Sequence, residues 1–173
     1  MPDLLRSAIR TVPDFPEPGI QFRDISPILA DAALLAGALE QLIAPWREAG
    51  ISRVIGIESR GFLFGAMMAE RLGAGFAMAR KPGKLPAETL SAAYSLEYGS
   101  DTVELHTDAV GRDDRVLIHD DVIATGGTAA ATTQLVSRLG GQVIGFSFFI
   151  ELVQLGGRAH LPADIPVHAV LAY

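Results

Sequence analysis

One stretch of this sequence indicates the fold more strongly than any other, His119-Asp120-Asp121-Val122-Ile123-Ala124-Thr125-Gly126-Gly127-Thr128. The apolar residues 116–118 lead into it, and their β-branched side chains predict a buried strand. After the two aspartates, a turn of small residues opens a helix predicted over 128–139. Backbone N–H groups at such a helix N-terminus form a cradle for a phosphate, and Thr125 and Thr128 can add hydroxyl donors. The stretch therefore predicts a phosphate-binding turn.

The adjacent carboxylates of Asp120 and Asp121 require an explanation, because two like charges that are buried side by side repel each other and destabilise the fold. Binding of sugar hydroxyls or a nearby cation would supply one. The turn is not a Walker A loop, since no Gly-Lys-Ser/Thr sequence occurs. The alternative is an ordinary strand–turn–helix connection with Thr128 as the helix cap, and that alternative leaves the acid pair unexplained.

Strands and helices alternate on both sides of this stretch. Apolar runs predict further strands at 54–57, 75–79, 143–150 and 167–171, while helical spacing predicts helices at 31–50 and 62–72. This alternation predicts an α/β protein with a mostly parallel central sheet and helices on both faces. Ligands of such sheets bind beyond the carboxyl ends of the strands, so we expect the chemistry to follow Ile57, Ala79 and His119.

Two segments fall outside this alternation. A short helix is predicted over 3–10, and the prolines of 13–19 indicate an ordered loop. Residues 81–114 are rich in glycine, proline and polar residues, and 94–98 and 102–106 alternate apolar and polar side chains. We expect this excursion to be a flexible hairpin that acts as a lid.

Composition bounds the class of protein. The 173 residues predict a single domain, residues 1–173, and 49% hydrophobic residues are enough for a core of its own. The net charge of −6 argues against a general nucleic-acid coat or a basic membrane-surface protein. The absence of cysteine excludes disulfides and thiolate metal sites, and it is compatible with a cytoplasmic location. No export signal or membrane-spanning apolar run is expected.

The stretch 119–128 resembles the motif with which type I phosphoribosyltransferases bind phosphoribosyl diphosphate (PRPP). Four other segments resemble the adenine phosphoribosyltransferases in particular, namely 15–27, 58–65, 80–86 and 94–99, and the tail 151–158 does so too. The resemblance implies the type I fold with a small N-terminal hood, in which residues 1–30 recognise the base and 81–114 form the flexible hairpin. His119 departs from the pattern, because the family has an apolar residue there.

The resemblance also implies a role for each candidate residue. Asp120 and Asp121 would hold the ribose hydroxyls of PRPP, and Glu97 would be the catalytic acid–base group. The 5′-phosphate would be bound by Ala124, Thr125, Gly126, Gly127 and Thr128. Pyrophosphate would be bound by Ser59, Arg60, Arg80, Lys81 and Lys84, and adenine by Gln21, Phe22 and Arg23. A cis peptide bond is expected near Glu58–Ser59.

Each role has a simpler alternative. Ser59 can be a helix cap, residues 80–84 a solvated basic loop, Phe22 a core residue, and Glu97 a solvated lid residue.

The implied activity is transfer of the 5-phosphoribosyl group from PRPP to adenine, giving AMP and pyrophosphate in purine salvage. Mg²⁺ would arrive bound to PRPP rather than on a metal site of the protein, and a homodimer is expected. No nucleic-acid or membrane partner is expected. The alternatives are a phosphoribosyltransferase for another purine, or a regulator of the same fold that binds PRPP or nucleotides without catalysis.

Overall fold

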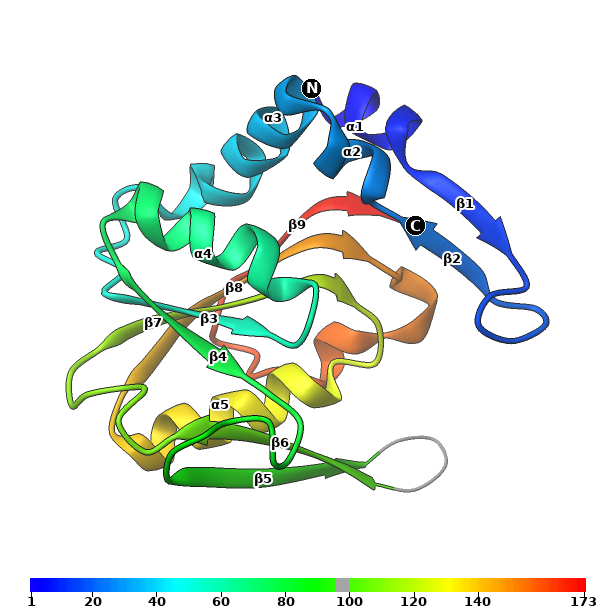
Figure 1. Ribbon diagram of the computed structural model, residues 1–173. Coiled ribbons are helices and arrows are strands. Elements are labelled where there is room, and N and C mark those ends of the chain that lie inside the picture. Colours follow the sequence, from blue (N-terminus) through cyan, green and yellow to red (C-terminus); the bar gives the residue numbers. More distant parts are fainter. Residues whose placement is uncertain (96–99) are drawn as a thin grey trace. The chain divides into compact units, whose positions relative to one another are not determined.

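The computed structural model describes residues 1–95 and 100–173 (Figure 1). The chain forms two compact units, residues 1–41 and residues 42–173. The larger unit holds the central sheet and the phosphate turn. The smaller unit holds the predicted base-recognition residues. In the described residues, no helix combines the length and apolar character needed to cross a membrane.

A five-stranded parallel sheet forms the centre of the larger unit. Its strands lie in the order β4 (Gly75–Ala79), β3 (Arg53–Ile57), β7 (Arg115–Ile123), β8 (Gln142–Glu151) and β9 (Val167–Ala172). The residues that suit a buried strand are buried: Val116, Leu117 and Ile118 have no exposed surface. The prediction of a parallel α/β sheet is confirmed. Strand β7 extends further than the apolar run, because Asp120, Val122 and Ile123 continue the pairing with β8.

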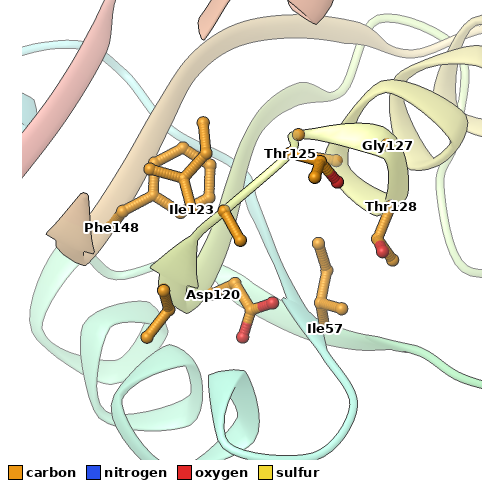
Figure 2. Close-up of a pocket in the computed structure, with 11 residues that line it drawn as sticks. Ile57, Asp120, Ile123, Thr125, Gly127, Thr128 and Phe148 are labelled. Carbon is orange, nitrogen blue, oxygen red and sulfur yellow. The ribbon is translucent and has the colours of Figure 1, made fainter. Parts of the chain in front are cut away.

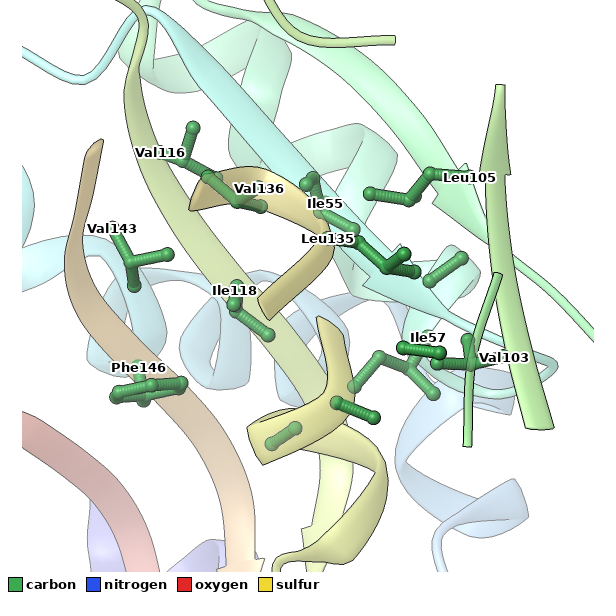
Figure 3. Packing of buried hydrophobic residues seen from close by; sticks show 14 of the residues in the cluster. Ile55, Ile57, Val103, Leu105, Val116, Ile118, Leu135, Val136, Val143 and Phe146 are labelled. Carbon is green, nitrogen blue, oxygen red and sulfur yellow. The ribbon is translucent and has the colours of Figure 1, made fainter. Parts of the chain in front are cut away.

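Two helices cover this sheet from opposite faces (Figure 1). Helix α5 (Gly127–Leu139) packs on the face to which Ile55 and Ile118 point, and Figure 3 shows its Leu135 and Val136 against these strand residues. Helix α4 (Gly61–Leu72) contacts β3, β4 and β7 on the other face. Neighbouring strand residues point to opposite faces, so each strand supplies side chains to both layers.

A hairpin of β5 (Thr89–Ser95) and β6 (Ser100–His106) extends the α5 layer. The two strands are antiparallel, and Val103 and Leu105 join the same hydrophobic cluster as α5 (Figure 3). The predicted two-stranded excursion is present, although its first strand begins before residue 94. A bridge between Arg80 and Glu104 joins the hairpin to the residue that follows β4.

The smaller unit contains α1 (Pro2–Ala8), β1 (Arg10–Pro13), β2 (Gln21–Asp24), α2 (Ser26–Ala30) and most of α3 (Ala32–Ile43). The carboxylate of Asp31 caps α3 by accepting hydrogen bonds from the N–H groups of Ala33 and Leu34 at 2.9 and 3.0 Å. The helix ends before the predicted residue 50, because Pro45 lies in a 3₁₀ turn over Ala44–Trp46.

The antiparallel pair β1–β2 was not predicted. Its connection is the proline-rich loop expected from the sequence, and the rings of Phe15 and Phe22 meet edge to face in it, with centroids 5.1 Å apart. The peptide bond Phe15–Pro16 is cis. Two further 3₁₀ turns, Val153–Leu155 and Gly157–His160, follow β8.

Candidate active site

The predicted phosphate turn encloses a small cavity of about 90 Å³ at the carboxyl end of β7. In Figure 2 the turn that carries Thr125, Gly127 and Thr128 curves around this cavity, and Asp120 lies on β7, which continues to Ile123. We call it the phosphate cavity. It is lined by Ile57, Asp120, Val122, Ile123, Ala124, Thr125, Gly126, Gly127, Thr128, Ala129 and Phe148. All five predicted phosphate-binding residues and one of the two aspartates therefore meet at one place.

Gly126 permits the shape of the turn. Its φ of +79° lies in the left-handed region, and a Cβ atom there would sit 2.3 Å from the carbonyl oxygen of Gly157. A Cβ atom on Gly157 would in turn sit 2.3 Å from the carbonyl oxygen of Ala124. Two backbone segments far apart in sequence thus touch directly, and only glycine allows this approach.

The tail behind the turn is held by Arg158. Its Nε and Nη2 atoms each donate to a carboxylate oxygen of Glu151 at 2.6 Å, and its Nη1 atom donates to the carbonyl oxygen of Val167 at 2.9 Å. Gly157 had no predicted role. The resemblance of 151–158 to the family was the signal that could have identified it.

The two aspartates lie in different environments although they are neighbours in sequence. Asp121 is buried and forms an ion pair with Arg60, whose Nε atom lies 2.9 Å from Oδ2. Asp120 is half-buried at the cavity wall, and its Oδ1 atom accepts a hydrogen bond from the N–H of Asp121 at 2.8 Å. Desolvation, together with the charge of Asp121, raises the pKa of Asp120 well above its usual value. Desolvation also raises the pKa of Asp121, and Arg60 opposes this change.

A second cavity of about 220 Å³ adjoins the first, because Ile57, Asp120 and Thr128 line both. We call it the clamp cavity. It is lined by Ile57, Glu58, Ala79, Arg80, Lys81, Tyr94, Asp101, Thr102, Val103, Asp120 and Thr128. It lies beyond the carboxyl ends of β3 and β4, as expected for a ligand site in a parallel sheet.

Two cationic side chains line the clamp cavity: Arg80, which is held by hydrogen bonds, and Lys81, which is more exposed. The Nε and Nη2 atoms of Arg80 each donate to a carboxylate oxygen of Glu58 at 3.1 Å, and its Nη1 atom donates to the carbonyl oxygen of Lys84 at 3.1 Å. The bond to Arg80 lowers the pKa of Glu58. The side chain of Lys81 is 67% exposed, and its Nζ atom lies 3.4 Å from Oδ2 of Asp101.

The other residues predicted for pyrophosphate lie near this cavity but not in its lining. Ser59 and Lys84 are exposed, and Arg60 pairs with Asp121. The peptide bond Glu58–Ser59 is cis, as expected from the family resemblance. Tyr94 and Asp101 line the cavity without having been predicted. Within the predicted hairpin 81–114, a role in the site had been predicted only for Lys81, Lys84 and Glu97.

The predicted adenine residues lie on β2 in the smaller unit. Gln21 is exposed, whereas Phe22 is half-buried. The Nη1 atom of Arg23 donates to Oγ1 of Thr11 at 2.5 Å. Glu97, the predicted catalytic residue, lies outside the described residues.

His119 points into the core on the α4 side of the sheet. It has no exposed surface, and its Nδ1 atom lies 2.8 Å from the carbonyl oxygen of Ser147, a geometry that makes Nδ1 the protonated nitrogen. Its ring meets that of Phe64 edge to face, with centroids 6.3 Å apart. Burial lowers the pKa of His119 from 6.5 to about 4, so the ring is neutral at physiological pH. The histidine at position 119, where the family has an apolar residue, therefore packs in the core on the α4 side of the sheet and does not line either cavity.

Comparisons with known proteins agree over nearly the whole chain. A family model for the phosphoribosyl transferase domain matches residues 24–158. The adenine phosphoribosyltransferase of Synechococcus sp. (strain JA-3-3Ab) is 58% identical over 168 residues, which cover 96% of each protein. The crystal structure of adenine phosphoribosyltransferase from Rhodothermus marinus DSM 4252 has 59% identity and a TM-score of 0.96, and the match covers 99% of this chain and 98% of that one.

A more distant relative was solved with ligands. The adenine phosphoribosyltransferase from Saccharomyces cerevisiae, complexed with D-2,5-dideoxy-2,5-imino-altritol 1,6-bisphosphate and adenine, has 40% identity and a TM-score of 0.92, with 98% of each chain covered. These matches confirm the resemblance to the adenine phosphoribosyltransferases. The chain belongs to the phosphoribosyltransferase family, among its adenine phosphoribosyltransferases.

Proposed function

We propose that this chain transfers the 5-phosphoribosyl group of PRPP to adenine, giving AMP and pyrophosphate in purine salvage. The observation that carries the proposal is the joining of two cavities at Asp120 and Thr128. One cavity is walled by a turn with backbone donors, and the other by cations. A sugar with a phosphate at one end and a diphosphate at the other needs such a pair of neighbouring sites.

The phosphate cavity would hold the 5′-phosphate and the ribose. The N–H groups at the start of α5 favour an anion, and the hydroxyls of Thr125 and Thr128 can donate further hydrogen bonds. The carboxylates of Asp120 and Asp121 would accept hydrogen bonds from the ribose hydroxyls. Those bonds would offset the desolvation of two neighbouring acids, which in the free chain raises the pKa of both.

The clamp cavity would hold the pyrophosphate group. Arg80 and Lys81 line it, and Ser59, Arg60 and Lys84 complete the proposed set from the surrounding segments. Fixed positive charge stabilises the negative charge that develops on the leaving pyrophosphate as its bond to the anomeric carbon breaks.

Mg²⁺ is proposed to enter with PRPP. Among residues 1–95 and 100–173, no group of three or more His, Asp or Glu side chains could hold a metal ion. Mg²⁺ takes oxygen ligands and is commonly bound through substrate phosphates, which the diphosphate group of PRPP would supply. When bound, Mg²⁺ would neutralise part of the diphosphate charge.

The base would be recognised by Gln21, Phe22 and Arg23. Exposed backbone groups of a short strand can discriminate the donor and acceptor pattern at the purine 6-position. Glu97 would manage the proton that adenine loses as the new bond forms. A homodimer in the cytoplasm completes the proposal, and it includes no nucleic-acid or membrane partner.

A panel of purines assayed with PRPP and Mg²⁺ tests the function. We expect AMP and pyrophosphate from adenine, and a kcat/KM for hypoxanthine or guanine lower by about 10⁴-fold, because a site built to pair with one base edge leaves polar groups unpaired with another. A preference for another purine would reassign the substrate. PRPP binding without transfer to any purine would indicate a regulator instead.

A further inference from the structure

Three acidic side chains line the clamp cavity: Asp120, Glu58, which pairs with Arg80, and Asp101, which pairs with the more exposed Lys81. Asp101 lies at the start of β6, and both it and Lys81 line the cavity. The Oδ2 atom of Asp101 lies 3.4 Å from Nζ of Lys81. A carboxylate in a site for pyrophosphate repels the ligand and occupies one of its cations, so its presence needs a reason.

Asp101 is anchored without the help of Lys81. Its Oδ1 atom accepts a hydrogen bond from the N–H of Thr102 at 2.8 Å, and its Oδ2 atom accepts one from the hydroxyl of Tyr94 at 3.1 Å. These bonds and the nearby Lys81 charge hold the pKa of Asp101 below its usual value, with the Thr102 bond contributing most. The carboxylate is therefore charged and fixed at neutral pH.

Lys81 is the cation that can change partners. Arg80 is committed to Glu58 and to the carbonyl oxygen of Lys84 by three hydrogen bonds. The Lys81 ammonium contacts the Asp101 carboxylate, and its side chain is 67% exposed. Exposed ion pairs contribute little net free energy, so an entering anion can take the ammonium from Asp101 at low cost.

We propose that Asp101 is an internal competitor of pyrophosphate for Lys81, and that it sets the affinity of the clamp cavity for the diphosphate group. With the cavity empty, Asp101 holds Lys81. With a diphosphate present, Lys81 turns to the ligand, and Asp101 remains as a nearby like charge that favours release. Tyr94 positions this carboxylate. The inference rests on the proposed function, because it takes the clamp cavity as the pyrophosphate site.

Calorimetric titration of the purified full chain with inorganic pyrophosphate and Mg²⁺, at fixed ionic strength, tests the inference. We expect Asp101→Asn to tighten pyrophosphate binding by about 3- to 10-fold, since the negative charge that competes for Lys81 and repels the ligand is removed. Asp108→Asn is the matched control: it removes one exposed acid in the turn after β6 and should leave the Kd within about 1.5-fold. Asp101→Ala repeats the test with a different side chain if the Asn variant folds poorly.

A double-mutant cycle separates competition for Lys81 from simple repulsion. Lys81→Ala alone should weaken pyrophosphate binding. In the Lys81→Ala background, the effect of Asp101→Asn should fall below about twofold. In turnover assays, Asp101→Asn should lower the KM for PRPP.

An unchanged or weaker pyrophosphate affinity of both Asp101 variants would overturn the inference, as would an equal tightening with and without Lys81. These outcomes leave AMP formation by the wild-type chain intact. Loss of the proposed function would show differently, as wild-type protein that neither binds pyrophosphate nor forms AMP.

Discussion

Asp120 and Asp121 combine a cost in stability with a capacity to bind. The pKa values of both carboxyl groups are raised, which means that the folded chain disfavours their charged forms. An ion pair with Arg60 relieves this for Asp121, whereas Asp120 lines both cavities. Hydrogen bonds from ligand hydroxyls to these carboxylates would offset this cost.

Replacing both residues, Asp120→Asn with Asp121→Asn, should abolish most PRPP use and preserve the fold. We expect kcat/KM for PRPP to fall by about 100-fold or more, because each lost charged hydrogen bond is worth about 1.5–3 kcal/mol. Loss of the mutual repulsion favours the fold and loss of the Asp121–Arg60 ion pair opposes it, so the melting temperature should change by only a few degrees. Asp108→Asn with Asp164→Asn removes two exposed acids as a control. Wild-type kcat/KM in the double variant would contradict the ribose assignment.

His119 should make stability depend on pH. Its pKa is about 4 in the folded chain and 6.5 when unfolded, so its contribution is complete above pH 6.5 and is lost as the pH falls toward 4. The full change corresponds to about 3 kcal/mol. The raised pKa values of Asp120 and Asp121 act in the opposite direction, and the measurement must therefore be a difference between two proteins.

His119→Asn keeps an N–H donor for the Ser147 carbonyl but does not titrate, so it is the reference. Urea unfolding at pH 7 and pH 4.5 should show the wild type losing about 2–3 kcal/mol more than this variant. Equal losses in the two proteins would mean that His119 is not held neutral by burial.

Glu97 stays a prediction that follows from the family resemblance. Glu97→Gln should lower the single-turnover rate of AMP formation by at least about tenfold, because a general acid–base group contributes that much or more. PRPP binding should change little. A rate within about twofold of wild type would reduce Glu97 to a residue of the hairpin without a role in proton transfer.

The phosphate turn and the tail behind it behave as one element. Gly126 needs a positive φ and also touches the carbonyl oxygen of Gly157, whereas Gly73 has a similar φ of +66° with open space around it. Substituting Gly73 therefore tests the cost of a positive φ alone, and substituting Gly126 tests that cost together with the steric contact.

Gly73→Ala should lower the melting temperature by only a few degrees, since a left-handed non-glycine residue costs about 1–2 kcal/mol. Its kcat/KM should stay near wild type. Gly126→Ala should lower the melting temperature further and reduce kcat/KM for PRPP at least tenfold, because the turn must move away from Gly157. Melting temperatures are measured by calorimetry and kcat/KM by AMP formation. Similar values for the two variants would mean that the contact between Gly126 and Gly157 does not contribute to stability or activity.

The family resemblance also predicts that two copies of this chain form a homodimer. Leu63 on α4 and Met78 on the edge strand β4 are 45% and 38% exposed. Sedimentation equilibrium should give twice the chain mass of 18.3 kDa. Specific activity should fall on dilution if the basic loop 80–84 reaches the partner's site. A monomer with full activity at all concentrations would contradict the homodimer.

The sequence alone determined the parallel sheet, the helices α4 and α5 and the phosphate turn. These depend on local patterns: apolar runs that suit a strand buried on both faces, and small residues that open a helix. The pair β1–β2 escaped prediction because prolines at its connection mask the strands, and the tertiary structure alone reveals their pairing. The excess length of β7 was also hidden, since its aspartates are uncommon in a buried strand.

Only the tertiary structure decided which residues share a cavity. Lys81 meets Asp101, and Gly126 meets Gly157, across gaps in sequence that no local pattern bridges. Arg80 and Lys81 are adjacent cations of one basic loop, yet one is fixed by Glu58 and the other stays largely exposed. Periodicity records which face of an element is buried, but ion pairing and backbone contact depend on the distance between atoms, and that distance is set when the elements pack.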